Sequence, residues 1–152
     1  MTAIEKLKEL KLLALKKKYP LNPSLECIVP KYKDKKANDL TKCIKDYIIL
    51  KDGQAERISS SGRYIDQSKI ITDVLGNKRK IGSGKWIKPN STNGTADISA
   101  IYKGKTLKIE VKIGQDSQSD AQIEYQKSVE SAGGFYFIAK NFQSFFEWFE
   151  TL

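Results

Sequence analysis

The sequence predicts a mixed α/β fold in which a mixed β-sheet is flanked by helices. Two observations indicate this class: apolar residues occur at helical spacing near both ends of the chain, and short runs of alternating apolar and polar residues lie between them. With 152 residues, 39% of them hydrophobic, the chain can bury one ordinary core. We therefore expect one α/β domain over residues 37–152, preceded by a basic helical extension over residues 1–36.

The N-terminal extension is expected to begin with an amphipathic helix. Residues 2–18 place apolar side chains at helical spacing, with lysines between and after them, and the pattern stops near Pro20. Residues 1–36 contain ten lysines and four acidic residues. We interpret the helix as one that packs on the core and exposes its lysines. Binding to a membrane surface or to a partner helix is the alternative.

The segments that follow lead to a basic loop. A second helix is expected over residues 39–50, and residues 54–75 have the pattern of extended chain. Residues 76–86 resemble a phosphate-binding loop, but Trp86 stands where such a loop needs Ser or Thr for magnesium. We therefore expect a flexible basic hairpin that contacts a DNA backbone, with a solvated turn as the alternative. Its candidate DNA-binding residues are Lys78, Arg79, Lys80 and Lys85.

Two alternating runs joined by a turn at Gly104 predict a β-hairpin in the C-terminal half. Asp97 begins the first run, and simple pairing about the turn sets it roughly opposite Glu110 or Val111 in the second run. Because side chains alternate along a strand, Glu110 and Lys112 point to the same face. The hairpin is therefore expected to bring two carboxylates and one ammonium group together at one strand end.

A helix, a strand and a final helix are expected after this hairpin. Ser119 and Gln122 have the spacing of a capping box, and Gly133 with Gly134 supplies a helix stop. The apolar run over residues 135–139 predicts a buried strand. An aromatic-rich helix closes the chain.

Composition limits the chemistry that such a chain can perform. The chain has no histidine, which excludes Ser-His catalysis, histidine general bases and the ordinary zinc hydrolases. Cys27 and Cys43 do not form a CxxC pair, so we expect plain reduced thiols. Hydrolysis would then depend on Asp, Glu, Lys and a hard metal ion.

The formal net charge of +9 favours a polyanionic partner, because basic side chains gain from releasing the counterions of nucleic acid phosphates. A basic surface that serves only solubility is the alternative. The sequence has neither a stretch of membrane-spanning length nor the pattern of a signal peptide. We therefore expect a soluble, cytoplasmic protein.

Phosphodiester hydrolysis is the chemistry that the acidic cluster suits. Asp97 and Glu110, helped by the backbone carbonyl of Val111, could hold Mg²⁺ or Mn²⁺ with water in the other positions. The ion would activate a bound water, and Lys112 would position that water and offset charge on the phosphate. The alternative is that Glu110 and Lys112 form an ordinary exposed ion pair on a strand.

Four runs of the sequence, in their order, spacing and residue types, resemble the VRR-NUC family of the PD-(D/E)xK nuclease superfamily. The runs are residues 94–98, 109–112, 118–122 and 133–136. The resemblance covers roughly residues 94–149. It implies a restriction-endonuclease-like fold over the domain that we place at residues 37–152.

The resemblance also implies roles for individual residues. Asp97 and Glu110 would be metal ligands, Lys112 the catalytic lysine, and Gln122 the glutamine that the family carries on the following helix. The activity implied is that of a Mg²⁺- or Mn²⁺-dependent DNA endonuclease. Stand-alone members of this family resemble structure-specific enzymes that act on branched DNA such as Holliday junctions, often as homodimers, and a bacterial, phage or mobile-element source fits that habit.

Two positions depart from the family pattern. Ala96 stands where the family usually has proline. The family also has an acidic residue on its first core helix, where this chain has Ala37, Asn38 or Thr41, with Asp39 adjacent. A DNA-binding module that keeps the fold without cutting, and an RNA-directed or partner-dependent nuclease, therefore stay open as alternatives.

Overall fold

The computed structural model of the protein describes residues 1–59, 62–87 and 92–152. The chain divides into two units: the first is Met1–Ile58 together with Asn93–Leu152, and the second is Ser59–Thr92. The first unit has the expected architecture of a mixed sheet flanked by helices. Residues 1–36 belong to this unit, so the division of the chain does not follow the boundary that we expected after residue 36.

The sheet of the first unit has four strands in the order β1-β6-β7-β8. They are β1 (Gln54–Arg57), β6 (Ile98–Tyr102), β7 (Lys105–Val111) and β8 (Phe135–Ala139). Pairing is antiparallel between β1 and β6 and between β6 and β7, whereas β8 runs parallel to β7. The hairpin expected around Gly104 is confirmed: Lys103 and Gly104 both have positive φ, as a two-residue type I′ turn requires.

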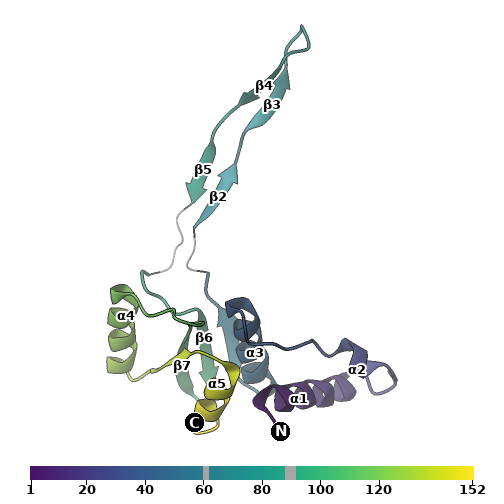
Figure 1. Ribbon diagram of the computed structural model, residues 1–152, viewed down its shortest axis with the longest axis vertical. Helices are drawn as coiled ribbons and strands as arrows, with labels where there is room; N and C mark the ends of the chain where they lie inside the picture. Colours follow the sequence, from purple (N-terminus) through teal and green to yellow (C-terminus); the bar gives the residue numbers. More distant parts are fainter. Residues whose placement is uncertain (60–61, 88–91) are drawn as a thin grey trace. The chain divides into compact units, whose positions relative to one another are not determined.

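Helices cover both faces of this sheet (Figure 1). They are α1 (Ala3–Lys18), the short α2 (Leu25–Ile28), α3 (Ala37–Leu50), α4 (Asp120–Ser131) and α5 (Phe142–Phe149). Side chains of α1, α3 and α5 form one hydrophobic core with a face of the sheet, and α4 contacts β8 from the other face. None of the described helices has the length and apolar character needed to cross a membrane.

The N-terminal helix α1 is part of the core. Thr2 and Glu5 form a capping box that starts it, and Leu7 is fully buried. Most of its lysines are exposed, so the expectation of a packing helix with a solvated lysine face is confirmed. The helix α3 carries the centre of the core, where Tyr47 packs its ring against aromatic side chains of α5.

The second unit is a two-stranded hairpin that is longer than expected. Its strands are β2 (Arg63–Asp66), β3 (Lys69–Thr72), β4 (Lys78–Ile81) and β5 (Gly84–Ile87). β2 pairs with β5, β3 pairs with β4, and the same register runs through both pairs. Residues 76–86, which we expected to be a hairpin by themselves, form only its turn and most of its returning side. Residues 54–75 are extended in part, as expected, but they divide between the two units.

Candidate active site

The hairpin of β6 and β7 places Asp97 directly beside Glu110. Ile98 pairs with Ile109, and the next step of this register sets the two acidic residues opposite each other. The Asp97 Oδ2 atom accepts a hydrogen bond from the Val111 backbone N–H at 2.9 Å. The sequence-based expectation that the two carboxylates meet at this strand end is therefore confirmed.

The alternation along β7 decides which face the charged residues occupy. Ile109 and Val111 lie in the hydrophobic core, so Glu110 and Lys112 point to the opposite face, where α4 lies. Both are nevertheless buried: Glu110 is 2% exposed and Lys112 is 7% exposed. Burial of this kind rules out the alternative of an ordinary exposed ion pair, because surface pairs on strands keep their charged groups in water.

The two oxygens of the Glu110 carboxylate differ in their surroundings. Oε1 lies 3.3 Å from the Lys112 Nζ and accepts a hydrogen bond from the Gln122 Nε2 at 2.5 Å. Oε2 is buried and has no hydrogen-bond partner in the described part of the chain. A buried carboxylate oxygen without a partner is costly, and the Tyr136 hydroxyl is the other buried side-chain polar atom without a partner in the described part of the chain.

The surroundings of Glu110 raise the pKa of its carboxyl group. Burial raises the pKa of its carboxyl group, and the neighbouring Asp97 raises that pKa further, while Lys112 and Gln122 act in the opposite direction. The effects that raise the pKa of Glu110 are larger than those that lower it, so burial and Asp97 disfavour its charged form. A cation bound between the two carboxylates would reverse them, because it would stabilise the charged form of both groups.

Lys112 is held by both its backbone and its side chain. Its N–H donates to the Ala139 carbonyl of β8 at 3.0 Å, which fixes the end of β7 in the sheet. Its Nζ lies 3.3 Å from Glu110 and 3.6 Å from the Oδ2 of Asp116, an exposed loop carboxylate. The ammonium group therefore sits between one buried and one exposed acid.

Gln122 serves the helix and the site at once. Its Oε1 accepts a hydrogen bond from the Ser119 N–H at 3.0 Å, which completes the capping box at the start of α4. Its Nε2 donates to Glu110. The two ends of one amide thus form both the cap bond and the contact with Glu110, and a role of Gln122 in a catalytic site stays a prediction.

Tyr136 is a neighbour of the site that the sequence analysis missed. It pairs with Lys108 in the parallel register of β7 and β8 and so lies on the Glu110 face of the sheet. Burial, with a contribution from the Glu110 charge, raises the pKa of its hydroxyl to about 12. The run over residues 135–139 was interpreted only as a buried strand. Tyr136 is the only residue of this run with a hydroxyl group, and that polar group in an apolar strand is the sequence signal that could have pointed to it.

The residues present fit a hard divalent cation with few protein ligands. No group of three or more His, Cys, Asp or Glu side chains gathers as a metal site in the described parts of the chain. The donors available are Asp97, the unpartnered Oε2 of Glu110 and the Val111 carbonyl. That carbonyl points to the Asp97 side of β7, since the N–H of the same strand residue already bonds there. Water would fill the remaining positions, as is usual for magnesium.

The first core helix supplies no acid to this site in the described residues. Asp39 is half-buried at the start of α3, and no hydrogen bond or ion pair joins it to Asp97 or Glu110. Thr41 is buried, and its hydroxyl donates to the Ala37 carbonyl one helical turn earlier. The structure therefore shows no contact between the acid at the start of α3 and this site in the described residues.

The expected DNA-binding residues lie in the other unit. Lys78, Arg79 and Lys80 belong to β4, Lys85 belongs to β5, and all four are exposed. The Lys80 Nζ pairs with the Asp66 carboxylate at 3.2 Å, which neutralises part of its charge.

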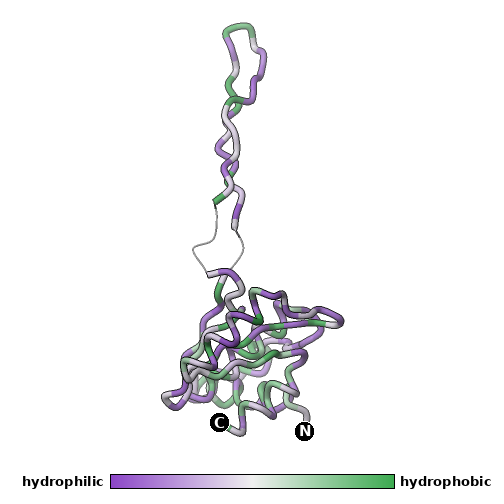
Figure 2. The backbone as a smooth tube through the Cα atoms, turned by 90° about the vertical axis from the view of Figure 1, so that its left-hand side faces the viewer, coloured by the Kyte–Doolittle hydropathy of each residue, from purple (hydrophilic) through white to green (hydrophobic). Residues whose placement is uncertain are grey.

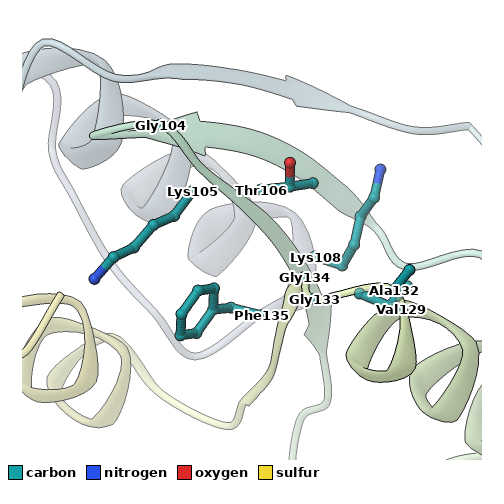
Figure 3. A pocket seen from close by; sticks show the side chains of 9 residues that line it. All are labelled: Gly104, Lys105, Thr106, Lys108, Val129, Ala132, Gly133, Gly134 and Phe135. Carbon is teal, nitrogen blue, oxygen red and sulfur yellow. The ribbon is translucent and has the colours of Figure 1, made fainter.

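A pocket of about 440 Å³ is lined by residues from the first part of β7 (Figure 3). Glu110 is near the other end of that strand. The pocket is bounded by the first residues of β7, the end of α4 and the start of β8. Lys105 and Lys108 supply its charges, and no carboxylate lines it. The Lys105 Nζ donates to the Leu152 carbonyl and the Lys108 Nζ donates to the Ser99 hydroxyl, so both cations serve local structure. The pocket contains none of the candidate site residues Asp97, Glu110 and Lys112.

Comparison with known proteins gives no family assignment. No protein-family model matches the chain, and no curated protein matches it either. The functional assignment therefore depends on the site geometry and on the sequence motifs quoted above.

Proposed function

We propose that the protein is a metal-dependent DNA endonuclease that hydrolyses phosphodiester bonds, with a restriction-endonuclease-like core of the kind found in the VRR-NUC family. The observation that carries this proposal is the buried, unpartnered Oε2 of Glu110 beside the Asp97 carboxylate. Two buried or half-buried acids next to a lysine are costly for stability, and catalysis is a sufficient reason to keep them.

Each residue of the candidate site would have its own role in hydrolysis. Asp97, Glu110 and the Val111 carbonyl would hold Mg²⁺ or Mn²⁺, which lowers the pKa of a bound water and polarises the phosphate. Lys112 would orient the attacking water and offset the negative charge that grows on the phosphate oxygens. Gln122 fixes the orientation of Glu110 through its amide, so that Oε2 stays directed away from the Lys112 ion pair.

The substrate and the assembly follow from the family resemblance and from charge. The net charge of +9 favours a nucleic acid. Branched DNA, including Holliday junctions, is the substrate class that the resemblance implies. A two-fold homodimer would supply two active sites for symmetric cuts.

A cleavage assay with variants of β7 tests the proposal. Glu110→Ala and Lys112→Ala are expected to lower Mg²⁺-dependent cleavage of DNA by about 100-fold or more, because each removes a group that acts on the phosphate or the water. Lys108→Ala is the matched control, since Lys108 lies on the same strand and face but bonds to Ser99. Junction, flap, duplex and RNA substrates are compared in one assay. Cleavage retained by Glu110→Ala would overturn the proposal.

A DNA-binding module without cleavage is the second candidate. It is favoured by one observation: Asp97 and one oxygen of Glu110 already have partners within the protein. The same assay separates the two candidates, because the module would bind DNA and leave it intact at any concentration of Mg²⁺ or Mn²⁺.

A further inference from the structure

The hairpin of the second unit, which we call the basic hairpin (residues 62–87), has no core of its own. None of its strand residues is buried, although many of them are apolar. Its large apolar side chains with at least half of their surface exposed are Tyr64, Ile70, Ile71, Val74, Leu75, Ile81 and Trp86. An isolated two-stranded hairpin is marginally stable in water, and such an exposed apolar surface indicates a binding partner.

Apolar and cationic side chains are paired across the basic hairpin. Five of its eight registered cross-strand pairs join one isoleucine to one lysine or arginine. Two examples are Ile65 with Lys85 and Ile71 with Arg79. Figure 2 shows the resulting mixture of hydrophobic and hydrophilic residues along the hairpin. A partner that lies along the strands would therefore meet cationic and apolar side chains next to each other.

The acids of the basic hairpin do not neutralise it. Asp66 and Asp73 are its two acidic residues, against six lysines and arginines. Asp66 pairs with Lys80. The Asp73 side chain binds the backbone of the turn: its Oδ1 accepts hydrogen bonds from the N–H groups of Leu75 and Asn77, both at 2.9 Å. Five cations of the described hairpin are thus without a carboxylate partner: Arg63, Lys69, Lys78, Arg79 and Lys85.

We propose that the basic hairpin is a DNA-binding β-ribbon that lies in a groove of the duplex, with its free cations on the phosphates and Val74 and Leu75 inserted between base pairs. This inference deepens the proposed function, because it names how the substrate is held. Two-stranded β-ribbons enter the grooves of B-DNA, and proteins that insert apolar residues between base steps do so from the minor groove. Like charge disfavours a second copy of the hairpin as the partner.

The length of the basic hairpin suits this role. Its outgoing side runs from Arg63 to Thr72, and a strand rises about 3.4 Å per residue, so the paired region spans about 30 Å. One turn of B-DNA has nearly the same length, about 34 Å. The cations along the strands can therefore reach phosphates on successive parts of one turn.

The tip of the basic hairpin is built to present an apolar wedge. Val74 is 103% exposed and Leu75 is 84% exposed, the largest exposures of apolar side chains in the hairpin. The turn beneath them is fixed by Asp73, whose N–H also donates to the Asn77 carbonyl, and by Gly76 with its φ of 84°. Architectural proteins insert apolar residues of this kind between base steps and kink the duplex.

Binding of the full-length protein to labelled duplex and junction DNA in EDTA tests the phosphate contacts without cleavage. The triple variant Lys69→Gln, Arg79→Gln, Lys85→Gln is expected to bind about tenfold or more weakly and to lower the slope of log K against log salt by about 2 to 3.

The matched control for this variant carries Lys8→Gln, Lys16→Gln and Lys17→Gln on α1, which makes the same change in net charge with exposed lysines elsewhere. It is expected to keep most of the affinity and of the salt slope. Equal behaviour of the two triple variants would overturn the proposal, because the effect would then be one of net charge alone.

The bend of the bound DNA tests whether Val74 and Leu75 insert between base pairs. Energy transfer between dyes at the two ends of a duplex of about 30 base pairs should rise when the wild-type protein binds, as insertion kinks the duplex by about 20–90°. Val74→Ser with Leu75→Ser should abolish that rise and leave the salt slope unchanged. An unchanged rise in this variant would overturn the wedge. Because both measurements omit divalent ions, loss of cleavage in the β7 variants and loss of DNA binding by the hairpin are separate outcomes.

Discussion

At the scale of single residues, two partnered carboxylates, the buried Glu110 and the exposed Glu150, have opposite shifts of their pKa. Glu110 is buried beside another acid, and burial raises its pKa, so its charged form is unfavourable without a cation. Glu150 has the opposite balance, because the Tyr47 hydroxyl and Lys51 hold the pKa of its carboxyl below the ordinary range. The first acid is the ligand-binding group of our proposal, and the second forms contacts that stabilise the fold.

Glu150 gives a pH-dependent prediction. Its hydrogen bond from the Tyr47 hydroxyl is 2.7 Å long, and its ion pair with Lys51 is 3.0 Å long. A lowered folded-state pKa contributes stability above the unfolded-state value of 4.5, and that contribution is lost as the pH falls through the folded-state value. Wild type should therefore exceed Glu150→Gln in unfolding free energy at neutral pH, by at most about 1 kcal/mol because the group is partly exposed.

Urea unfolding of both proteins between neutral and acidic pH checks this result. The control is Glu147→Gln, which removes the same charge from α5, the helix whose C-cap residue is Glu150. Glu147 accepts a hydrogen bond from Gln143 and, among the described residues, none from Tyr47 or Lys51. The difference in unfolding free energy between wild type and Glu150→Gln should shrink as the pH falls. A difference that stayed constant down to the lowest pH would show that the charge of Glu150 does not stabilise the protein.

At the scale of elements, the start of α4 connects helix stability to the site. Ser119 and Gln122 cap the helix, and only Gln122 also contacts Glu110. Ser119→Ala should cost about 1 kcal/mol of stability through loss of the cap and leave cleavage nearly unchanged. Gln122→Ala should cost a similar amount of stability and in addition lower the cleavage rate, about tenfold, by releasing Glu110.

Unfolding curves and single-turnover cleavage rates of the two variants make this comparison. If Ser119→Ala and Gln122→Ala lost cleavage equally, the glutamine would act only through the helix cap. A loss confined to Gln122→Ala fits a residue that positions Glu110.

The sequence predicts those elements whose signals are local. The turn at Gly104, the cap at Ser119 and the alternation around Glu110 each depend on a few neighbouring residues, and each is confirmed. The length of the basic hairpin was missed because polar residues 66–68 interrupt the alternation of its outgoing side. β2 and β3 pair with strands that follow the turn in the sequence. The register of these pairs is what shows that the two sides form one continuous hairpin.

For the candidate site, too, the sequence predicts only those features that depend on neighbouring residues. Opposition of Asp97 and Glu110 could be predicted, since one short turn sets the register. The burial of Glu110 and the position of Tyr136 could not, because they depend on the parallel pairing of β8 and on the packing of α4. Such contacts join residues that are far apart in the sequence, and no local pattern encodes them.

At the scale of the whole molecule, stability resides in the unit that holds the site. The expected extension is a structural part of this unit, as the burial of Leu7 shows. Leu7→Ala should lower the unfolding free energy by about 2–5 kcal/mol through lost burial and the cavity left behind. Leu13→Ala on the same helix is the control, because Leu13 is 55% exposed and its loss should cost about 0.5 kcal/mol or less. Equal unfolding midpoints in urea for the two variants would contradict a structural role for α1.

The central claim is that Asp97 and Glu110 hold a divalent cation, and anomalous diffraction from a crystal soaked in Mn²⁺ tests it most directly. The account predicts an anomalous peak between the Asp97 carboxylate and the Glu110 Oε2, within about 2.3 Å of each, and its absence in Glu110→Gln. A wild-type crystal in which the only Mn²⁺ peaks lie elsewhere, with the Glu110 Oε2 still unpartnered, would contradict it.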